Sequence, residues 1–122
     1  MPDTSALECF DNPAPRGDYV IEHVAEEFTS VCPRTGHPDF GRVTLRFCPD
    51  RRCVELKSLK LYYQSYRNEG IFYEAVTNRI RDDLTAVMQP RWLVLTTEWT
   101  GRGGIRSRIT ATHGSPPEFM LK

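Results

Sequence analysis

The sequence predicts one α+β domain in which two helices cover one face of a four-stranded antiparallel sheet. The length, 122 residues, suits a single domain. Apolar and polar residues alternate through much of residues 19–48 and 91–112, which is typical of strands. Between these two segments, apolar residues recur every three or four positions, which is typical of helices. The predicted element order is therefore β-β-α-α-β-β.

The chain divides into an arm, a domain and a tail. Residues 1–18 contain three prolines and one glycine but little periodicity, so we expect an N-terminal arm. Residues 19–114 hold all the periodic segments and are predicted to form the single domain. Residues 115–122 include two prolines and are expected to form a C-terminal tail.

The first hairpin lies between the arm and the helices. Residues 19–30 are predicted to form a strand that carries Val20, Val24 and Phe28 on one face. Residues 41–48 form the next strand, because apolar residues alternate with polar ones there. One face of this second strand is expected to be buried and the other to face solvent.

Two helices follow the first hairpin. The apolar stripe of the first helix consists of Leu56, Leu59, Tyr63 and Tyr66. The segment 68–70, Asn-Glu-Gly, is expected to break this helix. The second helix is predicted over residues 71–88, and Pro90 stops it. Its core stripe consists of Phe72, Val76, Ile80, Leu84 and Val87.

The second hairpin completes the sheet. Residues 91–100 are rich in Trp, Leu, Val and Thr, and residues 105–112 alternate again, so both segments are predicted to be strands. The segment 101–104, Gly-Arg-Gly-Gly, is expected to form a tight turn. Long edge strands and a thin core favour oligomerisation, because sheets from several subunits can pair edge to edge and close into a barrel.

The composition argues against several classes of function. Sixteen basic residues balance sixteen acidic ones, so no general field favours nucleic acids or acidic membranes. No apolar run approaches the roughly 20 residues that span a bilayer, and no secretory leader is visible. The four cysteines include no Cys-x-x-Cys pair, so no metal site is expected. We expect a cytoplasmic protein with reduced thiols, no membrane association and no directly bound nucleic acid.

The connection between the first two strands carries the residues best suited to catalysis. Cys32 and Asp39 lie close in sequence, and Pro33, Gly36 and Pro38 restrict the backbone between them. A thiolate can attack electrophilic carbon, and a confined carboxyl group can donate a proton. The alternatives are a small buried cysteine and an aspartate that caps a turn. The residue types alone leave these alternatives open.

Candidates for ligand binding lie on the helices and in the last turn. Glu74 is either a solvated helix residue or a carboxylate that accepts hydrogen bonds from two adjacent N–H groups of a guanine-like ring. Lys57, Lys60 and Arg102, each considered alone, are solvated charges. If the two regions that carry them meet, they form a basic cluster that can hold a phosphate group.

The segment Glu55-Leu56-Lys57-Ser58-Leu59-Lys60-Leu61-Tyr62 resembles the motif of the QueF family, the NADPH-dependent 7-cyano-7-deazaguanine reductases of queuosine biosynthesis. The family motif reads E-[S/L]-K-[S/A]-hydrophobic-K-[L/Y]-aromatic. Every position agrees in this chain. The resemblance extends over roughly residues 7–114 and includes the loop from Cys32 to Asp39.

This resemblance implies a tunnelling fold, assembled into a homo-oligomeric ring with active sites between subunits. It implies that NADPH reduces the nitrile of 7-cyano-7-deazaguanine to a primary amine, in a pathway of tRNA modification. Cys32 corresponds to the nucleophile that forms a thioimide, and Asp39 to the acid that protonates the nitrile nitrogen. The implied substrate-binding residues are Val54, Glu55, Leu56, Tyr73 and Glu74. The implied NADPH-binding residues are Lys57, Ser58, Lys60 and Arg102.

One position departs from the family. Many members carry histidine where this chain has Tyr73, and a phenol does not titrate near neutral pH. The departure leaves turnover and pH optimum open, and it keeps a non-catalytic deazapurine-binding ring protein as an alternative. A second alternative is a QueF-like amidinotransferase that acts on tRNA without NADPH, although the intact lysine-containing motif argues against it. Pterin synthases and cyclohydrolases of the same fold need zinc ligands that the sequence does not offer.

Overall fold

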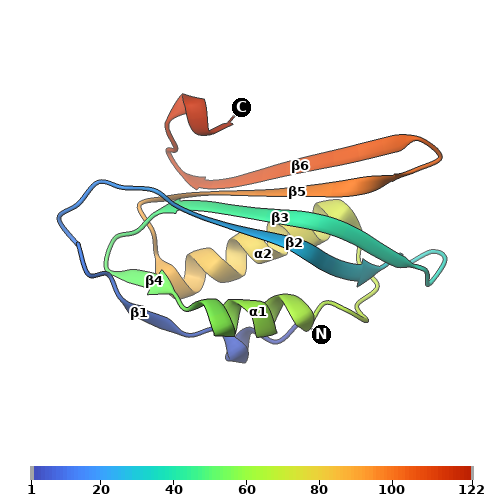
Figure 1. Cartoon of the computed structure of the whole chain (residues 1–122), viewed down its shortest axis with the longest axis horizontal. Helices are drawn as coiled ribbons and strands as arrows, with labels where there is room; N and C mark the ends of the chain where they lie inside the picture. Colours follow the sequence, from blue (N-terminus) through green and yellow to red (C-terminus); the bar gives the residue numbers. More distant parts are fainter. Residues whose placement is uncertain (1, 122) are drawn as a thin grey trace.

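A computed structural model describes residues 2–121 and, for Arg102, only the backbone. Figure 1 shows an elongated sheet with both helices beneath it. In chain order the elements are η1 (Thr4–Ala6), β1 (Cys9–Asp11), β2 (Ile21–Val31), β3 (Pro38–Cys48), β4 (Arg52–Val54), α1 (Leu56–Gln64), α2 (Tyr73–Met88), β5 (Trp92–Arg102), β6 (Ile105–Gly114) and η2 (Glu118–Leu121). Neither helix in residues 2–121 is long and apolar enough to cross a lipid bilayer.

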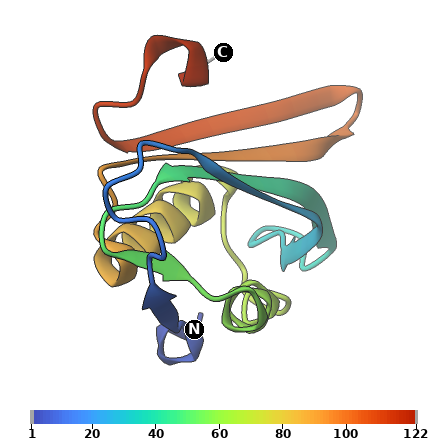
Figure 2. The same ribbon diagram turned by 60° about the vertical axis from the view of Figure 1, so that its left-hand side comes forward.

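The main sheet has the strand order β2-β3-β5-β6, and every neighbouring pair is antiparallel. Both α-helices lie on one face of it, as the second view makes clear (Figure 2). The predicted architecture is therefore confirmed. A separate two-stranded sheet joins β1 to β4, so part of the N-terminal arm is paired with the main body. Neither strand was predicted, because three residues are too few for alternation to show.

Strand β2 differs from the prediction because it contains a β-bulge. The pairing of β2 with β3 shifts register between Ala25 and Phe28. Ile21 and Ala25 contact the core together with Phe28, whereas Val20 and Val24 are exposed. The predicted common face for Val20, Val24 and Phe28 is wrong, since a bulge inserts a residue and turns the following side chains to the other face.

Strand β3 begins at Pro38, earlier than the predicted start at residue 41. Asp39 is therefore a strand residue, and it lies opposite Ser30 of β2. Side chains two residues apart share a face of a strand, so Asp39 lies on the face that also carries the buried Val43. The helices pack against this face, and Asp39 is thus directed toward the helix layer.

The core lies between the helix layer and the inward face of the sheet. Val76, Ile80 and Leu84 of α2 are fully buried, as predicted. Leu56 and Phe72 are 57% and 55% exposed, so their predicted core positions are wrong. Both stand at helix starts, where periodicity continues but no neighbouring turn covers the side chain. Tyr62 and Tyr66 are completely buried; Tyr62 falls outside the predicted stripe.

The opposite face of the sheet is more polar. Arg42 pairs with Glu26 at 3.0 Å, and Arg46 pairs with Glu22 at 2.8 Å, each between β3 and β2. Such exposed pairs contribute at most about 1 kcal/mol each to stability. A small apolar cluster of Cys48, Trp92 and Val94 on this face is partly covered by the C-terminal segment.

Candidate functional site

The loop between β2 and β3 holds Cys32 in a fixed conformation. The Cys32 amide donates to the carbonyl of His37 at 2.8 Å, and the Gly36 amide donates to the carbonyl of Cys32 at 2.9 Å. Gly36 has a φ of 74°, in the left-handed region that glycine favours. Cys32 is only 5% exposed. The loop therefore positions a shielded thiol.

Backbone hydrogen bonds attach this loop to the connection between the two helices. The Val31 amide donates to the carbonyl of Glu69 at 2.9 Å, and the Ile71 amide donates to the carbonyl of Val31 at 3.1 Å. Gly70 lies beside Pro33, where an added Cβ would be 3.6 Å from the Pro33 Cα. The predicted helix break at residues 68–70 thus has a second use, because it supports the cysteine loop.

Asp39 contacts the first residue of α2. The Tyr73 hydroxyl donates a hydrogen bond to Asp39 Oδ1 at 3.2 Å, and Asp39 is only 6% exposed. Burial keeps water away from the carboxyl group and strengthens its interactions with polar groups. Two residues predicted to have separate roles, Asp39 and Tyr73, are therefore direct neighbours.

Sequence reasoning missed two residues beside Asp39. Trp99 of β5 stacks on Tyr73, with ring centroids 4.1 Å apart and planes inclined by 7°. The Ser30 hydroxyl is buried opposite Asp39 in the β-ladder, and it has no hydrogen-bond partner within the described residues. Strand alternation placing Ser30 on the same face as Phe28 was the only signal that could have identified it.

Glu74 completes the group at this end of the molecule. It lies in the first turn of α2, adjacent to Tyr73, and its side chain is exposed and accessible to a ligand. The start of α2 and the tip of the β2–β3 hairpin lie at the same end in Figure 1. Four predicted site residues therefore lie at one end of the folded molecule: Cys32, Asp39, Tyr73 and Glu74.

The remaining predicted residues gather around the start of α1. Glu55 caps this helix, because its carboxylate accepts from the amides of Lys57 at 2.6 Å and Ser58 at 2.8 Å. These two hydrogen bonds hold the pKa of Glu55 below its ordinary value. The buried Ser58 hydroxyl contacts the backbone oxygens of Glu55 and Glu8. Val54 is buried in the core at the end of β4.

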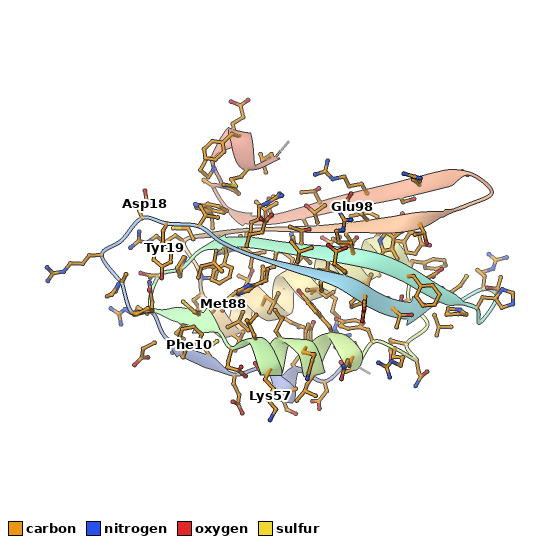
Figure 3. The ribbon with its side chains drawn as sticks, viewed as in Figure 1. Phe10, Asp18, Tyr19, Lys57, Met88 and Glu98 are labelled. Atoms are coloured by element: carbon orange, nitrogen blue, oxygen red, sulfur yellow. The ribbon has the colours of Figure 1, made fainter. Side chains whose placement is uncertain are left out.

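The lysines of α1 are open to ligands. Lys57 and Lys60 are both exposed, and Lys57 projects away from the sheet in Figure 3. Lys60 also lines a groove of about 400 Å³ between β2 and α1, together with His23 and Arg67. Cys32 and Asp39 do not line this groove. The Arg102 side chain lies outside the described residues, and its turn lies away from α1 in both views (Figures 1 and 2).

The other three cysteines have a different character. Cys9, Cys48 and Cys53 are free thiols, and Cys48 and Cys53 are buried. Burial raises the pKa of all three thiols, which disfavours the reactive thiolate. Cys48 and Cys53 therefore serve as small buried residues of the fold.

Comparisons with known proteins relate this arrangement to an enzyme family. A family model described as QueF-like protein matches residues 38–118. The NADPH-dependent 7-cyano-7-deazaguanine reductase of Rhodopirellula baltica is 56% identical over 117 residues, which cover 93% of this chain and 97% of that relative. The reductase of the same name from Chlorobium phaeovibrioides is 61% identical over 107 residues, which cover 88% of this chain and 92% of that relative.

A solved structure supports the fold independently. The crystal structure of the archaeosine synthase QueF-Like in the apo form matches with a TM-score of 0.76 and covers 83% of this chain and 99% of that chain. Its sequence identity is 20%, so this likeness concerns the fold alone. The α+β tunnelling fold expected from the sequence is confirmed.

Proposed function

The chain belongs to the QueF-like protein family, and from that premise we propose that it is an NADPH-dependent nitrile reductase. Its substrate is 7-cyano-7-deazaguanine, and its product is 7-aminomethyl-7-deazaguanine, an intermediate of queuosine biosynthesis. The observation that carries the proposal is that Cys32, in the loop after β2, and Asp39, near the start of β3, are both buried. A nucleophile and an acid in one confined site suit addition to a nitrile.

Cys32 begins the reaction by adding to the nitrile carbon. This carbon is only weakly electrophilic, so direct reduction is difficult. Addition of the Cys32 thiolate forms a carbon–sulfur bond and converts the C≡N triple bond into a C=N double bond. Asp39 gives a proton to the nitrogen, and the product is a thioimide. The covalent step divides one difficult reaction into easier ones.

The later steps return Cys32 to its starting state. When bound, NADPH supplies hydride to carbon, and two such transfers are needed. After the first transfer, the carbon–sulfur bond breaks and the electron pair returns to Cys32 as thiolate. Two hydrides and two protons balance the conversion of the nitrile into the amine. Asp39, which accepts a hydrogen bond from the Tyr73 phenol, donates protons to the nitrogen.

The binding roles that we propose are divided between two groups of residues. Glu74 accepts two N–H hydrogen bonds from the deazaguanine ring, with Tyr73 beside it. Val54, Glu55 and Leu56 complete the substrate pocket. The exposed ammonium groups on α1 fit the phosphates of NADPH, and the adjacent groove adds cationic and imidazole groups. The NADPH-binding set is Lys57, Ser58, Lys60 and Arg102.

We propose that the sites form between subunits of a homo-oligomeric ring. In one chain, the Cys32 loop and the start of α1 lie at opposite ends of the helix layer (Figure 1). A second copy that presents α1 to the Cys32 loop brings both groups of residues together. The catalytic domain in this proposal spans residues 19–114, and the free thiols suit the cytoplasm.

The test is a stoichiometric assay with the assembled protein, 7-cyano-7-deazaguanine and NADPH. We expect two NADPH to be oxidised for each nitrile consumed, and amine to accumulate. Folded, assembled protein that oxidises no NADPH would contradict the proposal. Formation of an amidine from ammonia without NADPH favours the amidinotransferase. Binding of the nitrile without any covalent adduct favours the non-catalytic alternative.

A further inference from the structure

The phenol of Tyr73 stacks on the indole of Trp99. The two rings are nearly parallel, with centroids 4.1 Å apart, and the phenol hydroxyl contacts Asp39 Oδ1 at 3.2 Å. Tyr73 is the first residue of α2, where the chain has only begun its helical hydrogen bonding. Stacking of this kind contributes about 0.5–1.5 kcal/mol beyond surface burial. The stack therefore limits rotation of the phenol and fixes the direction of its hydroxyl.

A closed chain of hydrogen bonds fixes Trp99 in turn. Its indole Nε1–H donates to Thr97 Oγ1 at 2.9 Å, and the Thr97 and Thr77 hydroxyls are 2.6 Å apart. Thr77 Oγ1 donates to the Tyr73 carbonyl at 2.7 Å, so its oxygen accepts from Thr97. Both threonines are completely buried. The network begins at the Trp99 ring and ends on the backbone of the residue that the ring holds.

Gly41 provides the space for the indole. It lies directly opposite Trp99 in the β3–β5 ladder, and an added Cβ would be 2.8 Å from Trp99 Cε3. Real Cβ atoms do not approach that closely, so a side chain at position 41 would displace the ring. Because Asp39 is two residues away on the same face of β3, the indole lies over the strand that carries the carboxyl group.

We propose that Trp99 is a positioning residue that acts through Tyr73 on Asp39. This role rests on the proposed function, because it concerns the acid that protonates the nitrile nitrogen. Without the stack, the phenol turns away from Asp39, and the carboxyl group loses a hydrogen bond that helps to orient it. Small errors in the position of a catalytic group can reduce rates by as much as about 100-fold. Trp99 itself does not contact the reacting atoms in this proposal.

A substitution of Thr97 tests the role with little disturbance of the site, because Thr97 contacts the Trp99 indole and Thr77. We measure the rate of Cys32 adduct formation at saturating 7-cyano-7-deazaguanine by acid quenching and intact mass, and the dissociation constant of the nitrile. Thr97→Val removes the acceptor of the indole N–H, and we expect an about 10-fold slower adduct rate with affinity within about twofold. Thr97→Ser keeps the hydroxyl and is expected to restore the rate. An unchanged rate in Thr97→Val overturns the role.

A double-mutant cycle tests whether Trp99 acts through the phenol. Trp99→Phe is expected to slow adduct formation in the wild-type background. In the Tyr73→Phe background, the same substitution is expected to lower the rate by less than about twofold. Full additivity overturns the role.

Trp92→Phe, on the other face of the sheet, is the matched control with an unchanged rate. It also leaves Trp99 as the sole tryptophan, so near-ultraviolet circular dichroism reports the stack directly, and an unchanged spectrum in Thr97→Val counts against the role.

The outcome for the wild-type protein separates this inference from the proposed function. Wild-type protein that forms no adduct overturns the reductase and the Trp99 role together. A wild-type adduct combined with normal rates in Thr97→Val and Trp99→Phe overturns the Trp99 role alone.

Discussion

Among the described residues, two tyrosine hydroxyls donate to aspartates, and their surroundings differ. Tyr62 donates to Asp83 at 2.5 Å in the core between α1 and α2. Tyr66 adds a hydrogen bond to Tyr62 at 2.8 Å, and Arg79 lies 3.7 Å from Asp83. This core cluster links the two helices and supplies each polar group with a partner. Burial and the neighbouring Asp83 raise the pKa of Tyr62.

The second pair, Tyr73 and Asp39, lies beside the loop that carries Cys32. Its hydrogen bond is longer, 3.2 Å, and the phenol ring stacks on the indole of Trp99. The same two residue types therefore serve stability in one place and, in our proposal, proton transfer in the other. The neighbours of the carboxyl group distinguish the two uses, since the pairing itself does not.

The aspartates provide the largest expected contrast. Asp39→Asn is expected to lower kcat by about 10²–10⁴-fold, the usual contribution of a general acid, with little change in stability. Asp83→Asn is expected to keep kcat within about threefold and to lower the free energy of unfolding by about 1–3 kcal/mol. NADPH oxidation and urea unfolding measure the two quantities. Normal turnover by Asp39→Asn contradicts the assignment.

The tyrosines should show the same contrast at smaller amplitude. Tyr73→Phe is expected to reduce kcat by about 10-fold, because Asp39 loses an orienting hydrogen bond. Tyr62→Phe leaves buried partners unsatisfied and is expected to cost about 1–2 kcal/mol of stability, with kcat nearly normal. The same two assays apply. If Tyr62→Phe lowers kcat as much as Tyr73→Phe, the distinction between the two pairs is lost.

Alkaline pH should weaken the core cluster. Burial raises the pKa of Tyr66 to about 12, above its ordinary value of 10.0. The folded state therefore holds this proton more tightly than the unfolded state, and the stabilisation is fully present below pH 10. It is lost as the pH rises from about 10 to 12. Urea unfolding across this range should show the decline, and Tyr66→Phe should make it shallower; an equally steep decline in that variant would exclude Tyr66 as a source.

A third carboxylate gives the smallest expected effect. Glu55 caps α1 and has a lowered pKa, so its contribution to stability is present above the ordinary glutamate pKa and is lost as the pH falls through the lower folded value. Glu55→Gln is expected to lower the melting temperature slightly at neutral pH. The difference from wild type should shrink in acid, where the wild-type carboxylate is also neutralised. A difference that stays constant with pH would argue against the charged cap.

The sequence predicted the architecture well because its alternation and helical periodicity extend over long segments. Val76, Ile80 and Leu84 could be assigned to the core in this way. The face of Val24 could not be assigned, because the β-bulge between Ala25 and Phe28 reverses the faces of the strand and is not visible in the residue pattern. Leu56 and Phe72 were misassigned because periodicity does not show where a helix leaves the core.

The candidate site was predictable in part. Residue types in one loop indicated Cys32 and Asp39, and the family resemblance added Tyr73, but neither predicted the contact between Asp39 and Tyr73. The Tyr73–Asp39 hydrogen bond requires the start of α2 to meet β3, which depends on tertiary packing. The Trp99 network is equally non-local, since it joins β5 to α2 through two threonines. The need for glycine at position 41 becomes clear only when its cross-strand neighbour, Trp99, is known.

The most direct test of the reductase assignment is the intact mass of the protein after incubation with 7-cyano-7-deazaguanine in the absence of NADPH. We predict an increase equal to the mass of one nitrile molecule per subunit, located on Cys32 and removed by adding NADPH. Cys32→Ala should show no increase, whereas Cys53→Ala should behave as wild type, because that thiol is buried and burial raises its pKa. Assembled wild-type protein without any adduct, or an adduct that persists in Cys32→Ala, would contradict the account.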